Sequence, residues 1–297
     1  MFGWFSAKWA WLLAKGTRQG VIWATMIYLV GALNDVVAKL LGSRLHWIEI
    51  AFFRFLFSTV VVLIIIAIGR RNLFRSSIHY LHIARGILGA IALGACCLSV
   101  NVMPLAENTT ILFSEALFMI PLSAHFLKEK ISPLSLVATI IGLCGLIIMF
   151  RPRTDNINLL AIIPTIAAFL FAIMNIIIKK MIDMKENTLT MLFYFGIYTT
   201  ILSGIIVPFY WTTPNAEEVL YISILGIGAN VIQLFIFLAY RATTASTISP
   251  VRYIELPFAI LFGFIFFDQI PKYTALIGAG LIIIGTIISS FCGRQRS

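Results

Sequence analysis

Residues 133–150 have the sequence PLSLVATIIGLCGLIIMF, which contains no charged side chain. A helix needs roughly 20 mostly apolar residues to cross the hydrocarbon core of a bilayer, and this run falls within the tolerated range. Similar runs lie on either side of it, joined by short polar connections. We therefore predict an all-α polytopic membrane protein with ten transmembrane helices. The predicted spans are residues 20–41, 47–68, 79–101, 105–127, 133–150, 157–179, 189–210, 217–240, 246–267 and 272–291.

The composition excludes most other classes of protein. The 297 residues are 60% hydrophobic and only 11% charged, whereas a soluble domain has about 25% charged residues. The net charge of +10 comes from Lys and Arg scattered over the connections, so no basic stripe for nucleic acid forms. The four cysteines match no metal or disulfide spacing, and no nucleotide-binding motif is present. We expect a small-molecule substrate and the lipid bilayer as partners, with no nucleic acid, metal, cofactor or catalytic residue.

The distribution of Lys and Arg predicts the orientation of the chain, because cytoplasmic connections carry an excess of these residues. With a cytoplasmic N-terminus, fourteen of the 22 Lys and Arg residues fall in cytoplasmic connections and four in connections on the other side. Both termini are therefore predicted to be cytoplasmic. Residues 1–19 contain several tryptophans and lysines without a cleavable signal pattern, which favours a segment lying in the membrane interface.

An internal repeat is visible as residues that recur at one separation. Asn34 recurs as Asn175 after 141 residues, and Glu129 recurs as Asp268 after 139. Each unit has five spans, and because five is odd the second unit enters the membrane from the opposite side. Such inverted repeats usually bind substrate at mid-depth between them and work by alternating access. The predicted units are an interfacial N-terminal segment at 1–19, a first repeat at 20–151, and a second repeat with a short basic tail at 152–297.

Two glutamates near the bilayer midplane give the strongest signal for a binding site. Glu115 lies near the middle of the fourth span and Glu255 near the middle of the ninth, at nearly equivalent positions of the two repeats. A charged side chain at the bilayer centre costs about 2.5–3.5 kcal/mol, so it needs a partner or a function. Glu255 also lies one turn after Arg252, and a purely structural ion pair between those two residues is the alternative interpretation.

Other charged residues inside the predicted spans are further candidates. Asp35 and Lys39 are four residues apart on one face of the first span, so Lys39 is interpreted as the partner of Asp35 or as an interfacial anchor. Arg54 lies near the centre of the second span and needs a carboxylate, for which Asp35 or Glu115 are available. The sequence leaves open whether Arg54 forms a structural ion pair or contacts substrate.

Uncharged polar and aromatic residues complete the candidate site. Asn34 and Asn175 occupy repeat-related positions, so they are expected to frame one cavity. Tyr253 lies between Arg252 and Glu255, and these charged neighbours make it a candidate for substrate contact.

Two further groups have a structural interpretation. Arg85 and Glu49 lie near span ends, where snorkelling and the membrane interface account for a charge. Small residues in the fifth and tenth spans are interpreted as helix-packing positions and give weak evidence for a dimer, so a monomer and a homodimer both stay open. These glycines are Gly142, Gly145, Gly278, Gly280 and Gly285.

The ten spans, the two inverted repeats and the acidic residues shortly before a proline, Glu129 and Asp268, resemble the drug/metabolite transporter superfamily with EamA-type repeats. Two segments are similar to a narrower group, the S-adenosylmethionine uptake transporters of obligate intracellular bacteria. They are NDVVAKLLGSRLHWIEIAFFR at 34–54 and RYIE at 252–255.

The resemblance implies a secondary transporter of the bacterial cytoplasmic (inner) membrane that takes up S-adenosylmethionine, in exchange for S-adenosylhomocysteine. This substrate has an adenine ring, a sulfonium, an ammonium and a carboxylate. On this interpretation Glu255, Glu115 or Asp35 face the cations and Arg252 the carboxylate, while Tyr253 or a phenylalanine contacts the ring or the sulfonium.

The residues alone leave two other functions open. One is a proton-coupled exporter of amino acids or drugs, in which a midplane glutamate carries the proton. The other is an integral-membrane enzyme or a non-transporting scaffold, for which the connections contain no catalytic constellation.

Overall fold

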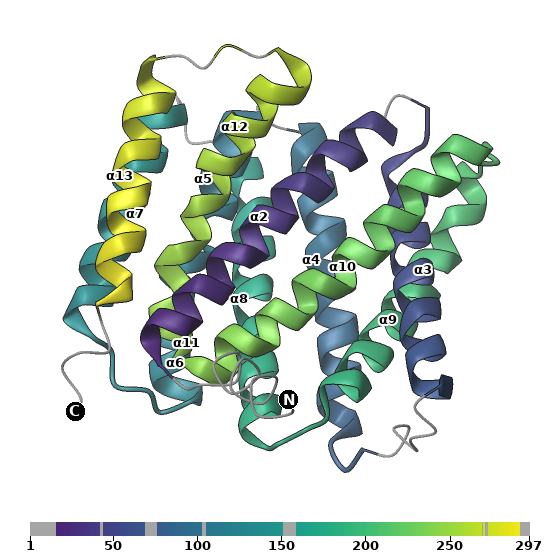
Figure 1. The fold of residues 1–297 in the computed structure, drawn as a ribbon, viewed down its shortest axis with the longest axis horizontal. Coiled ribbons are helices and arrows are strands. Elements are labelled where there is room, and N and C mark those ends of the chain that lie inside the picture. Colours follow the sequence, from purple (N-terminus) through teal and green to yellow (C-terminus); the bar gives the residue numbers. More distant parts are fainter. Residues whose placement is uncertain are drawn as a thin grey trace, which may run out of the picture.

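The computed structural model describes residues 16–41, 44–68, 76–102, 105–150, 159–268, 270 and 273–291, and the secondary structure in these ranges is helical (Figure 1). The prediction for the interfacial segment falls almost wholly outside these residues. The first half contains α2 (Thr17–Leu41), α3 (Trp47–Ile68), α4 (His79–Val102), α5 (Leu105–Leu112), α6 (Glu115–Phe126) and α7 (Pro133–Phe150). The second half contains η1 (Leu159–Ala161), α8 (Ile162–Asp183), α9 (Thr188–Ile206), η2 (Val207–Tyr210), α10 (Ala216–Ala242), α11 (Ala245–Ile248), η3 (Ser249–Ile254), α12 (Glu255–Phe267) and α13 (Tyr273–Ser290).

The helices have the composition of membrane spans. Within the described part of the chain, seven helical segments are long and apolar enough to cross a bilayer, and Pro133–Met149 forms a shorter apolar helix. Large apolar side chains such as Ile68 and Ile205 lie exposed on the surface of the bundle. An apolar surface of this kind suits contact with lipid, so the prediction of an all-helical polytopic membrane protein is confirmed.

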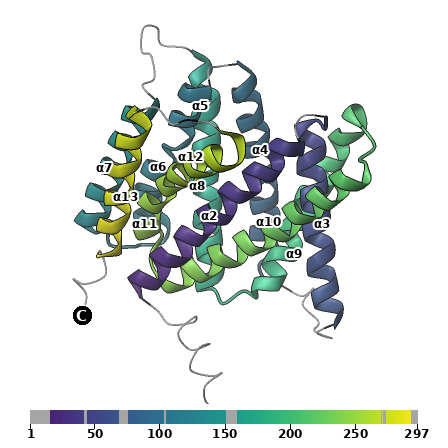
Figure 2. The same cartoon turned by 45° about the horizontal axis from the view of Figure 1, so that its top comes forward.

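Helices α7 and α13 lie side by side at one edge of the bundle (Figures 1 and 2). A Cβ atom added to Gly145 would come within 2.7 Å of the carbonyl oxygen of Gly278, and one added to Gly285 within 3.0 Å of that of Ala138. Only residues without a side chain allow the two backbones to approach so closely. Gly280 is different, because a Cβ atom there would meet nothing within 4 Å. Most of the predicted packing glycines therefore close a contact between two helices of the same chain.

Two of the predicted spans are interrupted. The range 105–127 contains α5 and α6, separated at Phe113 and Ser114, and the range 246–267 contains α11, η3 and α12. The hydroxyl of Ser114 donates to the carbonyl of Ile111 at 2.5 Å, and Pro250 near the start of η3 has no backbone N–H to donate. The range 105–127 is therefore two helices, whereas residues 245–267 form one helical segment that is interrupted by 3-10 geometry.

Both interruptions place a carboxylate at the start of a new helix. Glu115 is the first residue of α6, and Glu255 is the first residue of α12. The two glutamates thus hold the same position in a helix in the two halves of the chain.

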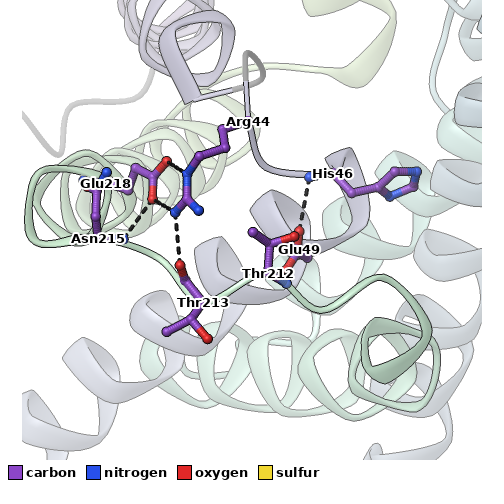
Figure 3. Close-up of polar contacts among 7 residues, drawn as sticks. All are labelled: Arg44, His46, Glu49, Thr212, Thr213, Asn215 and Glu218. Atoms are coloured by element: carbon purple, nitrogen blue, oxygen red, sulfur yellow. Dashed lines mark hydrogen bonds and ion pairs between the residues drawn. The ribbon is translucent and has the colours of Figure 1, made fainter.

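A set of polar contacts, which we call the loop clasp, joins the α2–α3 loop to the segment between η2 and α10 (Figure 3). Arg44 forms an ion pair with Glu218, with its Nε donating to Oε1 at 2.6 Å, and its Nη2 donates to the carbonyl of Thr213 at 2.9 Å. The Glu218 carboxylate also accepts from the backbone N–H of Asn215 at 2.7 Å, which caps α10. One carboxylate therefore fixes both the helix start and the neighbouring loop.

Glu49 forms the second part of the loop clasp. Its carboxylate accepts hydrogen bonds from the backbone N–H groups of His46, at 3.0 Å, and of Thr212. Glu49 is completely buried. Two loops of the protein, and not contact with the membrane interface, therefore satisfy the charge of Glu49.

We expect Glu49→Ala to destabilise the protein, because it leaves the N–H groups of His46 and Thr212 without their acceptor. A buried polar group left without its partner costs about 1–3 kcal/mol. Glu49→Gln keeps an amide oxygen and should cost less. Thermal unfolding of the purified protein measures the effect, with the exposed Glu217→Ala as the control. Equal midpoints for Glu49→Ala and Glu217→Ala would contradict the prediction.

Candidate functional site

The centre of the bundle contains a buried ion pair between the two halves of the chain. Nη1 of Arg252, on η3, lies 2.7 Å from Oε2 of Glu115, on α6. Nδ2 of Asn175, on α8, donates to the other oxygen of Glu115 at 2.7 Å. Glu115 is only 2% exposed. The alternative interpretation, an ion pair of Arg252 with Glu255, is corrected here, since Arg252 lies within ion-pair distance of Glu115.

Arg252 is surrounded by further groups from several helices. It interacts electrostatically with Glu255 on α12, Tyr28 on α2 and Cys96 on α4, in addition to Glu115. Its guanidinium group lies 5.1 Å from the ring centroid of Phe113, a cation–π arrangement. A cation at this position therefore connects residues from both halves of the chain.

Asp35 extends this network toward α3. Its carboxylate attracts Arg54 and repels Glu255 electrostatically. Nε of Arg54 is buried and has no hydrogen-bond partner among the described residues. Lys39 lies 3.9 Å from the ring centroid of Phe267 on α12, which makes it an anchor on α12 more than a partner of Asp35.

We call this connected set of charges the central site. It links α2, α3, α6, η3 and α12, with an amide from α8. The central site consists of Asp35, Arg54, Glu115, Asn175, Arg252 and Glu255.

Two predicted site residues point elsewhere. Nδ2 of Asn34 donates to the carbonyl of Leu225 at 3.4 Å, so Asn34 packs against α10 while Asn175 binds Glu115. The expectation that the two asparagines frame one cavity is not met. Tyr253 is fully buried and stacks on Phe113 with ring centroids 6.0 Å apart. Both residues hold helices together in this structure.

Arg85 differs from its expected role. It is completely buried, and its Nη2 donates to Oε1 of Gln233 at 2.8 Å while its Nη1 donates to the carbonyl of Met191 at 3.2 Å. Its guanidinium group also lies 4.2 Å from the ring centroid of Phe195. Snorkelling to the interface is therefore wrong for Arg85, which joins α4 to α9 and α10.

The sequence interpretation missed Tyr28 and Phe113. Tyr28 lies seven residues before Asp35 on α2, and this spacing places both on one face of a helix. The spacing to Asp35 could therefore have identified Tyr28 as a candidate from the sequence. Phe113 is one of 24 phenylalanines, and no pattern along the chain distinguishes it from those that face lipid.

Comparison with known proteins gives consistent results. The chain matches the EamA-like transporter family over residues 18–151 and 158–291. It is 33% identical over 281 residues to an S-adenosylmethionine uptake transporter of Rickettsia conorii, covering 95% of each chain. It is 34% identical over 276 residues to the protein of the same name from Rickettsia bellii, covering 93% and 94%. A riboflavin transporter of Rhizobium johnstonii is 24% identical over 272 residues, covering 90% of this chain and 89% of that protein.

The fold also has a counterpart among solved structures. One crystal structure superimposes with a TM-score of 0.76 at 15% sequence identity, covering 92% of this chain and 99% of that chain. At this identity the likeness concerns the fold alone. The apolar helices and the bacterial relatives identify a multi-pass protein of the bacterial inner membrane. From the match over both halves of its sequence, the chain belongs to the EamA-like transporter family.

Proposed function

We propose that this protein is a secondary transporter that takes up S-adenosylmethionine in exchange for S-adenosylhomocysteine by alternating access. The observation that carries the proposal is the central site, in which acids and bases from both halves of the chain meet inside a membrane protein. Relatives that share about a third of the sequence over nearly the whole chain bear the name of this substrate.

The proposal includes ten transmembrane spans arranged as two inverted repeats, with boundaries at 20–151 and 152–297 and both termini cytoplasmic. Three observations support it. The family matches each half separately, the interruptions before Glu115 and Glu255 occur in equivalent spans, and α2 begins at the same end of the bundle at which α13 ends (Figure 1).

Access to the central site differs from one residue to the next. Asp35 is exposed, Glu255 is partly exposed and Glu115 is buried. The segment that leads from Glu255 toward the end where α2 begins, α11 with most of η3, is buried. We propose that, in this orientation, substrate reaches the central site from the outside and that α11 and η3 close it on the cytoplasmic side.

The proposed substrate contacts follow from this geometry. Arg252 is already neutralised by Glu115, whereas Arg54 has a donor without a partner and is the better group for the substrate carboxylate. Asp35 and Glu255 are the more accessible acids, so they face the sulfonium and the ammonium. Glu115 and Asn175 hold Arg252 in place. Asn34 and Tyr253 act on substrate only indirectly, through helix packing.

The test is uptake of labelled S-adenosylmethionine into proteoliposomes that contain the purified protein, with S-adenosylhomocysteine inside. We expect uptake that rises with internal S-adenosylhomocysteine. We expect Glu255→Gln to weaken it about tenfold, since losing one ionic contact of about 1.4 kcal/mol has this effect. Glu217→Gln, on an exposed residue in the first turn of α10, is the control. No uptake by the wild type would reject the proposal, and uptake that stops when the proton gradient collapses would favour the proton-coupled alternative.

A further inference from the structure

An apolar cavity of about 310 Å³ lies between α3, α4, α8 and α9. Its walls include the rings of Phe55, Phe171 and Phe195 and the thioether of Met174. Cavities that bind small molecules have volumes of about 300–1,000 Å³. This cavity is at the lower end of that range, so it accommodates part of a metabolite-sized ligand and not the whole of a large one.

The walls of this cavity offer an occupant almost no hydrogen-bonding group. Its polar lining side chains are Thr199 and Ser203. The hydroxyl of Thr199 donates to the carbonyl of Phe195 at 2.6 Å, and that of Ser203 to the carbonyl of Thr199 at 2.7 Å. Since both donors are used within α9, the walls offer apolar contact to the faces of a flat ring and no hydrogen bond to its edge. Phenylalanine rings contact such a group favourably through its face or its edge.

The cavity adjoins the central site through α3 and α8. Ala51, in the cavity wall, lies three residues before Arg54 on α3. Phe171, also in the wall, lies four residues before Asn175 on α8, whose amide binds Glu115. Residues three or four apart on a helix share one face, so wall and charges are neighbours on each helix.

Helix α4 repeats this arrangement a third time. Leu93 lines the cavity, and Cys96, three residues further on, interacts electrostatically with Arg252. Three separate helices therefore carry a cavity residue within one turn of a residue that belongs to or touches the central site. A ligand that places charged groups in the central site has an apolar recess beside it.

We infer that this cavity binds a fused heteroaromatic ring of the substrate, while the central site binds its charged part. The inference rests on the proposed function and names the adenine ring of S-adenosylmethionine as the occupant. Riboflavin, which gives other relatives their name, also combines a fused heteroaromatic ring with a polar chain. The cavity thus provides the aromatic contact with substrate that was expected of Tyr253, whose ring is instead buried against Phe113.

The test fills the cavity from a position that tolerates a side chain. A Cβ atom on Gly94 would meet nothing within 4 Å, so Gly94→Leu projects into free space within the cavity. Gly280→Leu is the matched control, because a Cβ atom on Gly280 also meets nothing within 4 Å and α13 does not line the cavity. Phe171→Leu removes one ring of the wall and serves as a second variant if Gly94→Leu does not fold.

The measurement is binding of labelled S-adenosylmethionine to purified protein in nanodiscs, with adenosine and methionine as separate competitors. We expect Gly94→Leu to weaken binding by about tenfold or more, which corresponds to about 1.4 kcal/mol. Adenosine should compete in the wild type and lose this ability in Gly94→Leu, and Phe171→Leu should show the same change to a smaller degree. Gly280→Leu should bind as the wild type does.

The outcomes separate this inference from the proposed function. If the wild type takes up S-adenosylmethionine and folded Gly94→Leu binds it with unchanged affinity, the inference is overturned and the proposed function stands. If native mass spectrometry then shows that Gly94→Leu has lost a co-purified phospholipid, the occupant is an acyl chain, which also overturns the inference. A wild type that neither binds nor transports S-adenosylmethionine rejects the proposed function itself, and the adenine assignment with it.

Discussion

Arg252→Gln and Glu115→Gln are each expected to stop uptake and to destabilise the fold. Each change leaves one member of the 2.7 Å ion pair in place without its partner. Removing one partner of a buried ion pair costs about 3–5 kcal/mol, because the remaining charge is uncompensated in a medium of low polarity. Glu115→Gln also replaces the carboxylate that accepts a hydrogen bond from the Asn175 amide by a neutral amide group. Thermal unfolding and uptake in proteoliposomes measure the two effects.

The double variant Glu115→Gln with Arg252→Gln separates structure from function. With both charges removed, we expect much of the stability to return, since a neutral pair can still form a hydrogen bond. Uptake should stay absent, because Arg252 no longer positions the charges of the central site. Asp183→Asn, which breaks the more exposed ion pair with Lys179, is the control. A double variant that recovers full uptake would reduce the Glu115–Arg252 pair to a structural role.

Gly278→Val is expected to prevent α13 from packing against α7. A Cβ atom on Gly278 would lie within 2.9 Å of the Met149 Cβ atom and closer still to the Gly145 carbonyl oxygen. Because real Cβ atoms do not approach backbone so closely, the two helices must separate. Overpacking of a well-packed core costs about 1–3 kcal/mol and at times more. We expect a lower midpoint of thermal unfolding and a lower yield of folded protein.

Gly280→Val, two residues further along α13, provides the comparison. A Cβ atom there meets nothing within 4 Å, so the variant carries the same change in helix propensity without the clash of its Cβ atom. We expect its unfolding midpoint to stay close to that of the wild type. Equal destabilisation by both variants would mean that helix propensity, and not the contact with Gly145, sets the effect.

The sequence predicts the helices well because lipid imposes a simple rule. A backbone that crosses a bilayer must satisfy its own hydrogen bonds, so long apolar runs form helices. The same rule makes a midplane charge costly, which is why Glu115 and Arg252 could be selected from the sequence as site residues. The burial of Glu115 and its contact with Arg252 are consequences of that cost.

The partners of these charges could not be predicted in the same way. A spacing of three residues between Arg252 and Glu255 suggests contact only if both lie on one continuous α-helix. The chain changes from a 3-10 helix to an α-helix at Glu255, so this spacing does not hold. For Arg85, the distance from its own helix end indicated snorkelling, but its position is decided by contacts with Gln233 and Met191 on other helices.

The charges of the central site have a consequence for the energetics of uptake. Asp35, Glu115 and Glu255 carry three formal negative charges, and Arg54 and Arg252 carry two positive ones. One net positive charge on S-adenosylmethionine makes the loaded site neutral, whereas S-adenosylhomocysteine, which lacks the sulfonium, carries none. Each proposed exchange then moves one positive charge inward. A membrane potential of about 100 mV, negative inside, contributes about 2.3 kcal/mol per charge, so the voltage across the cell membrane would favour the proposed exchange in the direction of uptake.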